Sequence, residues 1–428
     1  MLSVAFKSEC YGGKTLIEVG IGWYTLCEVL MKIVCCANMP YAKEAFSTLG
    51  ETLIKDGRII APADVRDAQV LAIRSTTVAN QALLDGSSVK FVGTATIGTD
   101  HMDTAWFERE GIRWCYAPGC NANSVSEYVT AALLCLANRH GFALDGKTVG
   151  VIGVGHVGSL VVKKAEALGM RVLRNDPPKE EEARSQKSGV RSQRTAKTGR
   201  EGINYVSLDK ILAESDIITL HVPLTRTGPY ATYHMADGSF FGKMKRGGVF
   251  FNCARGATVD TDALLTAMDK GIVAHAVIDT WEGEPVYRTD LLNRVDIGTP
   301  HIAGHSFEGK VMGTVMVYQE ACKFLGMKAA WSPDNLLPPP LVPEVDIDAS
   351  GKSDEAVLRD IVRRVYDIEA DDRRMRQGGG LDDKARGVHF DGLRKNYPMR
   401  REFRFTRGVL QNPAPGLVSK VARLGFHM

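Results

Sequence analysis

The sequence lacks a large excess of charge of either sign. Its 53 Lys and Arg residues nearly balance its 50 Asp and Glu residues, which leaves a formal net charge of +3 over 428 residues. Proteins that bind nucleic acid through electrostatic attraction carry a much larger basic excess. We therefore expect no nucleic-acid partner, and any anionic ligand has to be recognised by a local site.

The sequence also lacks a long apolar run. No uninterrupted apolar stretch reaches the roughly 18 residues of a membrane span. The first thirty residues contain an apolar patch, but Glu18 and Glu28 interrupt it and no small-residue cleavage site is evident. We expect no membrane association and no signal peptide, and we predict a cytoplasmic protein.

Cysteine spacing typical of metal sites or disulfide frameworks is missing too. The nine cysteines are an odd number, and none of them forms a CxxC pair. This pattern fits a reducing compartment better than a disulfide framework. No bound metal is predicted.

The order of apolar and amphipathic segments predicts the first domain. From Lys32 onward, apolar runs alternate with amphipathic segments, which is typical of a parallel sheet covered by helices on both faces. We predict that residues 1–30 are an extension outside the fold. Residues 31–120 and 287–333 are predicted to form a discontinuous substrate-binding domain.

The stretch from Lys147 to Asp176 predicts a dinucleotide-binding unit. It reads as a strand, a glycine turn, an amphipathic helix and a second strand that ends at an acidic residue. In this fingerprint Gly153 makes the tight turn, Gly155 lets the backbone approach a pyrophosphate, and Gly158 lets the helix pack closely on the sheet. We assign residues 121–286 to this domain.

Asp176 indicates which dinucleotide is bound. It follows the last glycine by about the twenty residues that the fingerprint requires, so its carboxylate can accept the ribose hydroxyls. A 2′-phosphate at that position would be repelled, which favours NAD over NADP. Arg174 argues the other way, because a cation can accommodate the phosphate.

Two later segments have distinctive compositions. Residues 179–202 are rich in Arg, Lys, Ser and Gly and have almost no large apolar side chain, so they cannot bury enough surface to offset the entropy of ordering. We predict a mobile surface loop there. Residues 336–343, LLPPPLVP, have the composition of a stiff linker, and a smaller domain over 334–428 follows, with a helix near 354–366.

Three residues suited to alcohol oxidation follow predicted strands or turns. Removal of a hydride from a secondary alcohol needs a base for the hydroxyl proton and a cation for a neighbouring carboxylate, while a nicotinamide does the redox step. His301 suits the base, Glu284 can hold its ring, and Arg255 offers a planar fork for a carboxylate. Taken singly, each is also compatible with an ordinary structural role.

The first domain offers candidate substrate contacts. Arg74, Ser75 and Thr96 lie in loops that follow apolar strands, where open α/β sheets collect their ligands. The alternative is that Ser75 and Thr96 cap helices.

At these positions the sequence resembles a known family. NCARGATVD, DTWEGEP and TPHIAGH, after GVIGVGHVG, resemble the D-2-hydroxyacid dehydrogenases. More narrowly, IRSTT, FVGTATIGTDHMD, APGCNA and LRKNYPMRRE resemble the branch of that family that oxidises 4-phospho-D-erythronate in pyridoxal phosphate synthesis. The resemblance runs from about Met31 to about Phe403, including the tail.

The resemblance implies a fold and an activity. The fold is α/β, with two Rossmann-like doubly wound parallel-sheet domains and a smaller α+β dimerisation domain at the C-terminal end. The reaction is the NAD-dependent oxidation of a phosphorylated hydroxy acid to 2-oxo-3-hydroxy-4-phosphobutanoate by a homodimer. By motif position His301 is the proton donor or acceptor, and Arg255 and Glu284 are the other catalytic residues. The remaining implied contacts are Ser75 and Thr96 with the substrate and Asp176, Asp279 and Gly304 with the cofactor.

The sequence departs from the family pattern at two site positions. Val222 stands where a threonine near the cofactor is usual, and His305 stands where a substrate tyrosine is usual. Backbone atoms of Val222 can still serve the cofactor, so we keep it as a candidate cofactor contact and His305 as a candidate substrate contact.

The basic tail allows two interpretations. Arg394, Lys395, Arg400 and Arg401 crowd around Tyr397. Arg394 is predicted, with Arg74, to bind the substrate phosphate if a dimer brings the tail over the partner's cleft. The alternative is a solvated basic face.

Two other functions remain open at this point. One is a different 2-hydroxyacid dehydrogenase, such as one that acts on phosphoglycerate, against which the APGCNA and LRKNY segments argue. The other is a scaffold that senses NAD and binds a protein partner without useful turnover, against which the intact Arg255, Glu284 and His301 argue.

Overall fold

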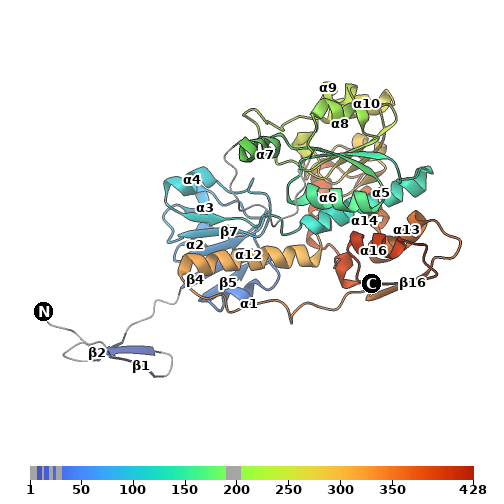
Figure 1. Cartoon of the computed structure of the whole chain (residues 1–428). Helices are drawn as coiled ribbons and strands as arrows, with labels where there is room; N and C mark the ends of the chain where they lie inside the picture. The colour runs from blue at the N-terminus through green and yellow to red at the C-terminus, as the bar shows by residue number, and fades with distance from the viewer. Residues whose placement is uncertain (1–6, 12–13, 19–22, 26–30, 189–203) are drawn as a thin grey trace. The chain divides into compact units, whose positions relative to one another are not determined.

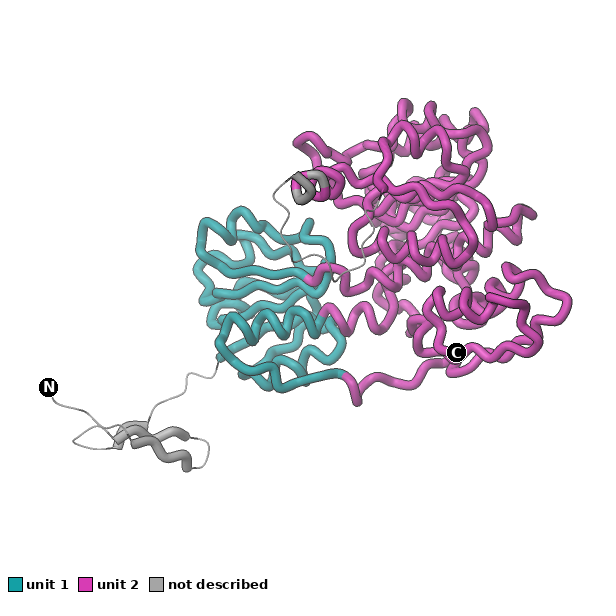
Figure 2. Tube along the Cα trace, viewed as in Figure 1, with its two compact units in different colours: residues 1–116, 314–333 teal, residues 117–313, 334–428 magenta. Residues whose placement is uncertain are grey.

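The computed structural model describes residues 7–11, 14–18, 23–25, 31–188 and 204–428. The chain divides into two compact units, shown in teal and magenta in Figure 2. Unit 1 comprises residues 1–116 and 314–333, and unit 2 comprises residues 117–313 and 334–428. Each unit contains a parallel sheet flanked by helices, which confirms the predicted α/β fold with two doubly wound sheets (Figure 1).

The sheet of unit 1 has five strands in the order β5-β4-β6-β7-β8, and every neighbouring pair is parallel. All four residues of β6 and of β7 are buried, because both faces of the sheet are covered. The strands are β4 Lys32–Cys36, β5 Glu51–Lys55, β6 Val70–Ile73, β7 Phe91–Thr94 and β8 Arg113–Cys115.

Helices cover this sheet on both faces. Phe46 and Tyr318, from the first and last helices of unit 1, belong to one core, whereas Leu84 and Trp106 belong to the core on the other face. The helices are α1 Ala42–Phe46, α2 Pro62–Val65, α3 Gln81–Leu84, α4 Thr104–Arg109 and the C-terminal part of α12 Phe307–Leu325.

Parts of the first thirty residues form a sheet of their own. Strands β1 Lys7–Tyr11, β2 Lys14–Glu18 and β3 Trp23–Thr25 pair antiparallel in that order. These three strands pair with no strand of the five-stranded sheet. That residues 1–30 lie outside the fold stays a prediction.

The sheet of unit 2 has six parallel strands in the order β10-β9-β11-β12-β13-β14. Successive residues point to opposite faces: Ile217 joins one core, and Ile218 joins the other. The strands are β9 Thr148–Ile152, β10 Arg171–Asn175, β11 Ile217–Leu220, β12 Gly248–Asn252, β13 Val273–Ile278 and β14 Ile297–Gly298.

Two groups of helices cover the sheet of unit 2. Helices α5 Ala122–His140 and α6 His156–Ala167 pack on each other and on one face. The other face is covered by α8 Leu208–Glu214, α9 Gly238–Gly242, α10 Thr261–Asp269 and α11 Thr289–Arg294, of which α8, α9 and α10 lie together in Figure 1. No described helix combines the length and apolar character that a membrane crossing needs.

The tail packs into unit 2. Leu358 and Leu424 join the core of α5 and α6, and Phe390 joins the core on the other face. Residues 334–428 therefore complete both layers of unit 2, whereas the sequence predicts a separate domain there. The tail contains the parallel pair β15 Glu344–Asp348 and β16 Arg407–Gln411, with α13 Asp354–Val365, α14 Ile368–Arg376, α15 Asp383–Lys395 and α16 Leu417–Leu424.

The chain re-enters unit 1 later than the sequence suggests. The predicted return is at residue 287, but β14 pairs with β13, which keeps the chain in unit 2 through residue 313. The assignment of a substrate-binding and a dimerisation role to particular ranges stays a prediction.

The polar segment after Asp176 begins as a helix, which corrects part of the prediction of a loop over 179–202. Helix α7 spans Pro177–Ser188. Proline is favoured at the first helical position, and the Asp176 carboxylate accepts a hydrogen bond from the Lys179 N–H at 3.2 Å. The rest of the predicted loop lies outside the described residues.

A buried ion pair attaches the tail to the start of α12. The Glu308 carboxylate pairs with Arg401 and accepts the backbone N–H of Glu402 at 3.0 Å. Both side chains of the pair are 4% exposed. Removing one partner of such a pair leaves a buried charge without compensation, which is costly.

We predict that Glu308→Ala lowers the free energy of unfolding by about 3–5 kcal/mol, because Arg401 is then left buried and unpaired. The matched control is Glu320→Ala on the same helix, whose exposed pair with Lys323 contributes about 0–1 kcal/mol. Urea unfolding of the two variants measures the difference. Equal losses would show that the buried pair does not hold the tail.

Candidate active site

The three candidate catalytic residues follow three neighbouring strands. Arg255 comes after β12, Glu284 after β13 and His301 after β14, and these strands are adjacent and parallel. Their carboxyl ends therefore meet at one edge of the sheet, where open α/β folds bind their ligands.

His301 and Glu284 form a hydrogen-bonded pair. The Nδ1 atom of His301 lies 2.6 Å from Oε1 of Glu284, and both side chains are more than a quarter exposed. Burial alone would raise the pKa of Glu284, but the charge and hydrogen bond of His301, followed by the charge of Arg394, lower it below the ordinary value. A carboxylate that stays charged in this way fixes the ring and stabilises the imidazolium.

A buried carboxylate shapes the loop that carries His301. One oxygen of Asp279 accepts hydrogen bonds from Thr299 Oγ1 at 2.7 Å and from the N–H groups of Ile302 at 2.8 Å and Ala303 at 3.1 Å. Burial raises the pKa of Asp279, while the charge of His301 and these hydrogen bonds oppose the rise. The structure thus gives Asp279 a role in positioning the loop, and its predicted cofactor contact stays a prediction.

The backbone of His301 is in the left-handed region, with φ of 55°. This conformation is uncommon for a residue with a side chain and recurs at functional sites, where the surroundings hold it in place. The His301 N–H donates to the carbonyl of Asp279 at 2.7 Å, which fixes the turn. Thr299 completes the support, because its hydroxyl lies 2.7 Å from that of Tyr128 on α5.

Sequence reasoning missed this support. No local pattern marks Thr299 or Tyr128, since each depends on a neighbour that is distant in the chain. The only local signal was an acidic residue directly after a strand, at Asp279.

Hydrogen bonds within the turn after β12 fix the backbone of Arg255. Its carbonyl accepts hydrogen bonds from the Asn252 side chain at 3.2 Å and from Thr258 Oγ1 at 2.6 Å. The next residue, Gly256, lies against the carbonyl of Trp281, at the start of the segment that carries Glu284. The turn after β12 therefore packs on the turn after β13.

The glycine turn after β9 has the geometry that dinucleotide binding requires. Gly153 has φ of 85°, and a Cβ on Gly158 would lie 2.0 Å from the Gly153 carbonyl oxygen. Apart from Gly155 itself and its chain neighbours, no atom of the described residues lies within 4 Å of the Cβ position of Gly155, which is the N-cap of α6 and offers no side-chain cap. Open space and free N–H groups at a helix N-terminus fit a pyrophosphate.

Asp176 lies across this turn. It directly follows β10, and its Oδ2 accepts the Val154 N–H at 2.8 Å. Arg174, the residue that argued for NADP, pairs instead with Glu166 at 2.5 Å. The Arg174 guanidinium is therefore already paired with a carboxylate, which favours NAD over NADP.

Val222 also reaches the dinucleotide turn. A Cβ on Gly153 would lie 2.9 Å from Val222 Cγ1, so the two residues are immediate neighbours. The adjacent His221 is half-buried, and the burial of its ring lowers its pKa to about 3, so this histidine is neutral. Its Nδ1 is a buried atom with no hydrogen-bond partner in the part of the chain that the structure describes.

Gly304 and His305 lie in the loop that follows His301. Gly304 packs against the side chain of Asn121 at the start of α5. The ring of His305 lies edge-on to Tyr397, with ring centroids 5.8 Å apart. Tyr397 of the tail thus borders the loop that carries His301 in the same chain.

Two residues of the basic stretch in the tail, Arg400 and Arg401, are buried. Arg400 donates to the carbonyls of Ala303 at 2.7 Å and Ser124 at 3.0 Å, and it is 6% exposed. Arg401 is buried against Glu308. For these two arginines the solvated-face interpretation is wrong, because they bind backbone carbonyls and a buried carboxylate.

Arg394 remains a candidate for the substrate phosphate. It lies at the end of α15, its side chain is a quarter exposed, and it is close enough to Glu284 to lower that carboxyl's pKa. Its role stays a prediction.

The candidate substrate contacts of unit 1 follow two adjacent strands. Arg74 and Ser75 come after β6, and Thr96 comes after β7. The helices beyond them are capped by Asn80 and Asp103, so the helix-capping alternative for Ser75 and Thr96 is wrong.

Comparison with curated proteins identifies the family. The chain is 43% identical over 397 residues to the erythronate-4-phosphate dehydrogenase of Shigella boydii serotype 4 (strain Sb227), covering 93% of this chain and 98% of that protein. It is 42% identical over the same length to the erythronate-4-phosphate dehydrogenase of Escherichia coli O157:H7. The chain belongs to the erythronate-4-phosphate dehydrogenase family.

Two family models match separate parts of this member of the erythronate-4-phosphate dehydrogenase family. Residues 134–303 match the NAD-binding domain of D-isomer specific 2-hydroxyacid dehydrogenases, which confirms the predicted NAD cofactor and the dehydrogenase class. Residues 336–425 match a domain of unknown function, DUF3410.

Solved structures agree with the fold. A D-lactate dehydrogenase from Aquifex aeolicus complexed with NAD and lactic acid aligns with a TM-score of 0.53 at 25% identity, over 69% of this chain and 95% of that one. An NAD-bound 3-phosphoglycerate dehydrogenase from Entamoeba histolytica aligns with a TM-score of 0.56 at 22% identity, over 70% and 96%.

We predict that NAD binds more tightly than NADP. Asp176→Ala should reduce the ratio of the two dissociation constants by about 10- to 100-fold, the effect of losing hydrogen bonds to a charged group. Glu166→Ala should improve NADP binding alone, because it releases Arg174. Titration of both cofactors into each protein gives the dissociation constants. Equal affinities for the two cofactors in the native protein would contradict the assignment.

We predict that His301→Asn lowers turnover by about 10²- to 10⁴-fold while NAD still binds, since a general acid–base group contributes about that much. Asparagine tolerates the left-handed backbone. In Glu284→Gln the imidazolium loses its counter-charge, so the acid limb of the pH–rate profile for oxidation should move to lower pH. Normal turnover in His301→Asn would end the assignment.

Proposed function

We propose that this protein oxidises 4-phospho-D-erythronate to 2-oxo-3-hydroxy-4-phosphobutanoate with NAD, a step of pyridoxal 5′-phosphate synthesis. The observation that carries the proposal is the His301–Glu284 pair at the carboxyl edge of the sheet that also holds the glycine turn. The identity with named erythronate-4-phosphate dehydrogenases over nearly their whole length supports the choice of substrate.

In this function His301 takes the hydroxyl proton. Its Nδ1 is engaged by Glu284, which leaves Nε2 to face the substrate hydroxyl. The bound NAD supplies the hydride acceptor. As the proton arrives, the neighbouring carboxylate stabilises the ring as an imidazolium, and Asp279 keeps the loop from moving.

The remaining candidates divide recognition between the two ends of the substrate. We assign the substrate carboxylate to Arg255, whose guanidinium matches it in a bidentate manner. Ser75, Thr96 and His305 are assigned as further substrate contacts. Gly153, Gly155, Gly158, Asp176, Val222, Asp279 and Gly304 are assigned to NAD.

The phosphate needs cations, because it carries up to two negative charges. We assign Arg394 and Arg74 to it, the first from the tail and the second from the loop after β6.

We also propose a cytoplasmic homodimer that associates through the tail. Several large apolar side chains of the tail are exposed, among them Val388 at 68% and Val418 at 43%. Association sites are built from contiguous patches of such side chains, and these residues of the tail are the ones from which we propose that a patch is built. Sedimentation velocity of the full chain tests this, and a monomer at micromolar concentration would refute it.

Activity with three substrates tests the function. We expect the highest kcat/KM with 4-phospho-D-erythronate, and much lower values with 3-phosphoglycerate and with unphosphorylated erythronate. Preference for 3-phosphoglycerate would identify a different 2-hydroxyacid dehydrogenase. Binding of NAD without turnover of any of the three would favour the sensing scaffold.

We predict that Arg394→Ala raises the KM for the phosphorylated substrate by about 10- to 100-fold, because a charge-assisted hydrogen bond is lost. Weak activity on unphosphorylated erythronate should not change. Lys395→Ala removes the same charge from the next, exposed position of α15 and is the matched control. An equal loss with both substrates would mean that Arg394 acts on Glu284 and not on the phosphate.

A further inference from the structure

Two histidines and an aspartate meet at the edge of unit 2 opposite the candidate active site. His140 is the last residue of α5, His275 lies near the start of β13, and Asp296 directly precedes β14. The strands are parallel, so these positions mark the amino-terminal edge of the sheet, whereas His301 lies beyond its carboxyl edge. The cluster is therefore separate from the catalytic residues.

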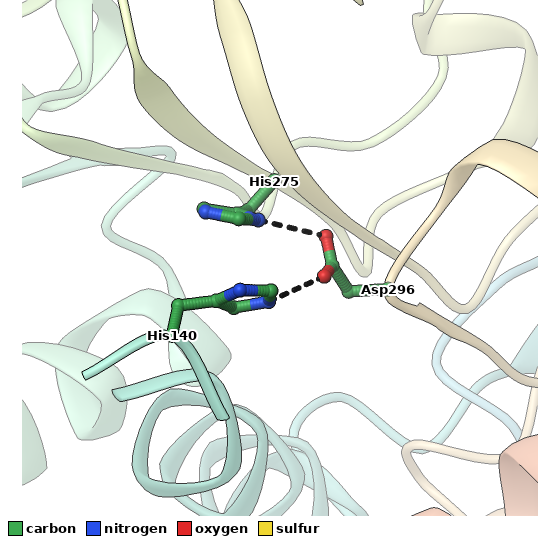
Figure 3. A group of neighbouring side chains, drawn as sticks. All are labelled: His140, His275 and Asp296. Carbon is green, nitrogen blue, oxygen red and sulfur yellow. Dashed lines mark hydrogen bonds and ion pairs between the residues drawn. The ribbon is translucent and has the colours of Figure 1, made fainter. Parts of the chain in front are cut away.

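Both imidazole rings point at one carboxylate, as Figure 3 shows. Asp296 Oδ1 lies 2.6 Å from His140 Nε2, and Oδ2 lies 3.3 Å from His275 Nδ1. The two rings are stacked, with centroids 3.6 Å apart. One potential ligand atom from each of the three residues lies within 4.8 Å of the other two.

This donor set is suited to a divalent transition metal. Zinc binds imidazole nitrogen and carboxylate oxygen at about 2.0–2.2 Å, so the ligand atoms of a tetrahedral site lie about 3.3–3.6 Å apart. The three atoms here, each within 4.8 Å of the others, are close to that spacing before an ion binds. Imidazole favours zinc, copper and nickel over magnesium or calcium. The side chains are 13–27% exposed, which leaves the cluster open to an ion and to a water ligand.

Neighbouring groups hold the carboxylate in place. Asp296 Oδ2 accepts the Ala276 N–H at 3.1 Å, and the Asp296 carbonyl accepts the Arg139 guanidinium at 2.7 Å. Outer partners of this kind orient ligands in metal sites. They leave Oδ1 directed at His140, where an ion would replace the proton between them.

We propose that His140, His275 and Asp296 bind one zinc ion, with water as the fourth ligand. The ion ties the C-terminal end of α5 to β13 and to the start of β14. Its role is structural, because the site lies at the opposite edge of the sheet from His301. The sequence predicts no metal, since the three ligands come from distant segments without a recognisable spacing.

The test is zinc chloride added to metal-free full-length protein, measured by competition with a chromogenic chelator. We expect the wild type to bind one zinc ion that His140→Gln and His275→Gln bind at least about tenfold more weakly, since even loss of an outer partner costs 10–100-fold. His140 ends a helix at the surface, so its substitution leaves the fold intact. Zinc should raise the melting temperature of the wild type and of neither variant.

The matched control is His234→Asn. His234 pairs with Glu282 at 2.5 Å and stacks on Tyr233, but no second imidazole among the described residues forms a metal-ligand group with it. This variant should bind zinc like the wild type. If the wild type and all three variants bind zinc equally, the ion occupies another site, such as cysteines, and the proposal fails. Absence of zinc binding at micromolar concentration would also refute it.

Discussion

The candidate active site depends on one buried carboxylate. Asp279 is 1% exposed, and a charge removed from water to this extent is tolerated only when hydrogen bonds replace its hydration. Thr299, Ile302 and Ala303 supply those bonds, and all three belong to the loop that carries His301. The hydrogen bonds that satisfy the buried acid therefore also hold the backbone of His301 in its unfavourable conformation. The hydroxyl contact from Thr299 to Tyr128 extends this support to the longest helix of unit 2.

The tail follows the same physical logic. Two of its arginines satisfy buried groups of unit 2: Arg401 pairs with the Glu308 carboxylate, and Arg400 donates hydrogen bonds to two backbone carbonyls. A buried charge without a partner is costly and therefore rare. Arg401 and Glu308 are accordingly buried together. This explains why Arg400 and Arg401 are buried, whereas other arginines of the tail, such as Arg404, are exposed. The charge of another tail residue, Arg394, lowers the pKa of the Glu284 carboxyl.

Much of the fold could be predicted because its signals are local. The apolar strands, the glycine turn at Gly153 and the acidic residue after β10 each occupy a few consecutive positions, and the structure has them where the pattern indicates. The ends of α7 and the burial of Arg400 could not be predicted, since they depend on neighbours that the sequence does not mark. The same holds for the carboxylate of Asp296, which meets His140 across 156 residues of chain. The composition of a segment indicates how it behaves when it is exposed to water. Tertiary contacts determine whether the segment is exposed in the folded protein.

The last residues of the chain have a consequence for synthesis. Phe426 stacks on Phe403, with ring centroids 4.6 Å apart, and both belong to the core that α5 and α6 share. A ribosome makes α5 and α6 long before it makes Phe426. These helices can cover the sheet first, but the side on which α13 and α16 pack stays open until the tail is made. All of unit 1 has been made by residue 333, whereas unit 2 still needs the tail. During that interval the exposed apolar side chains of α5 and α6 are a substrate for chaperones.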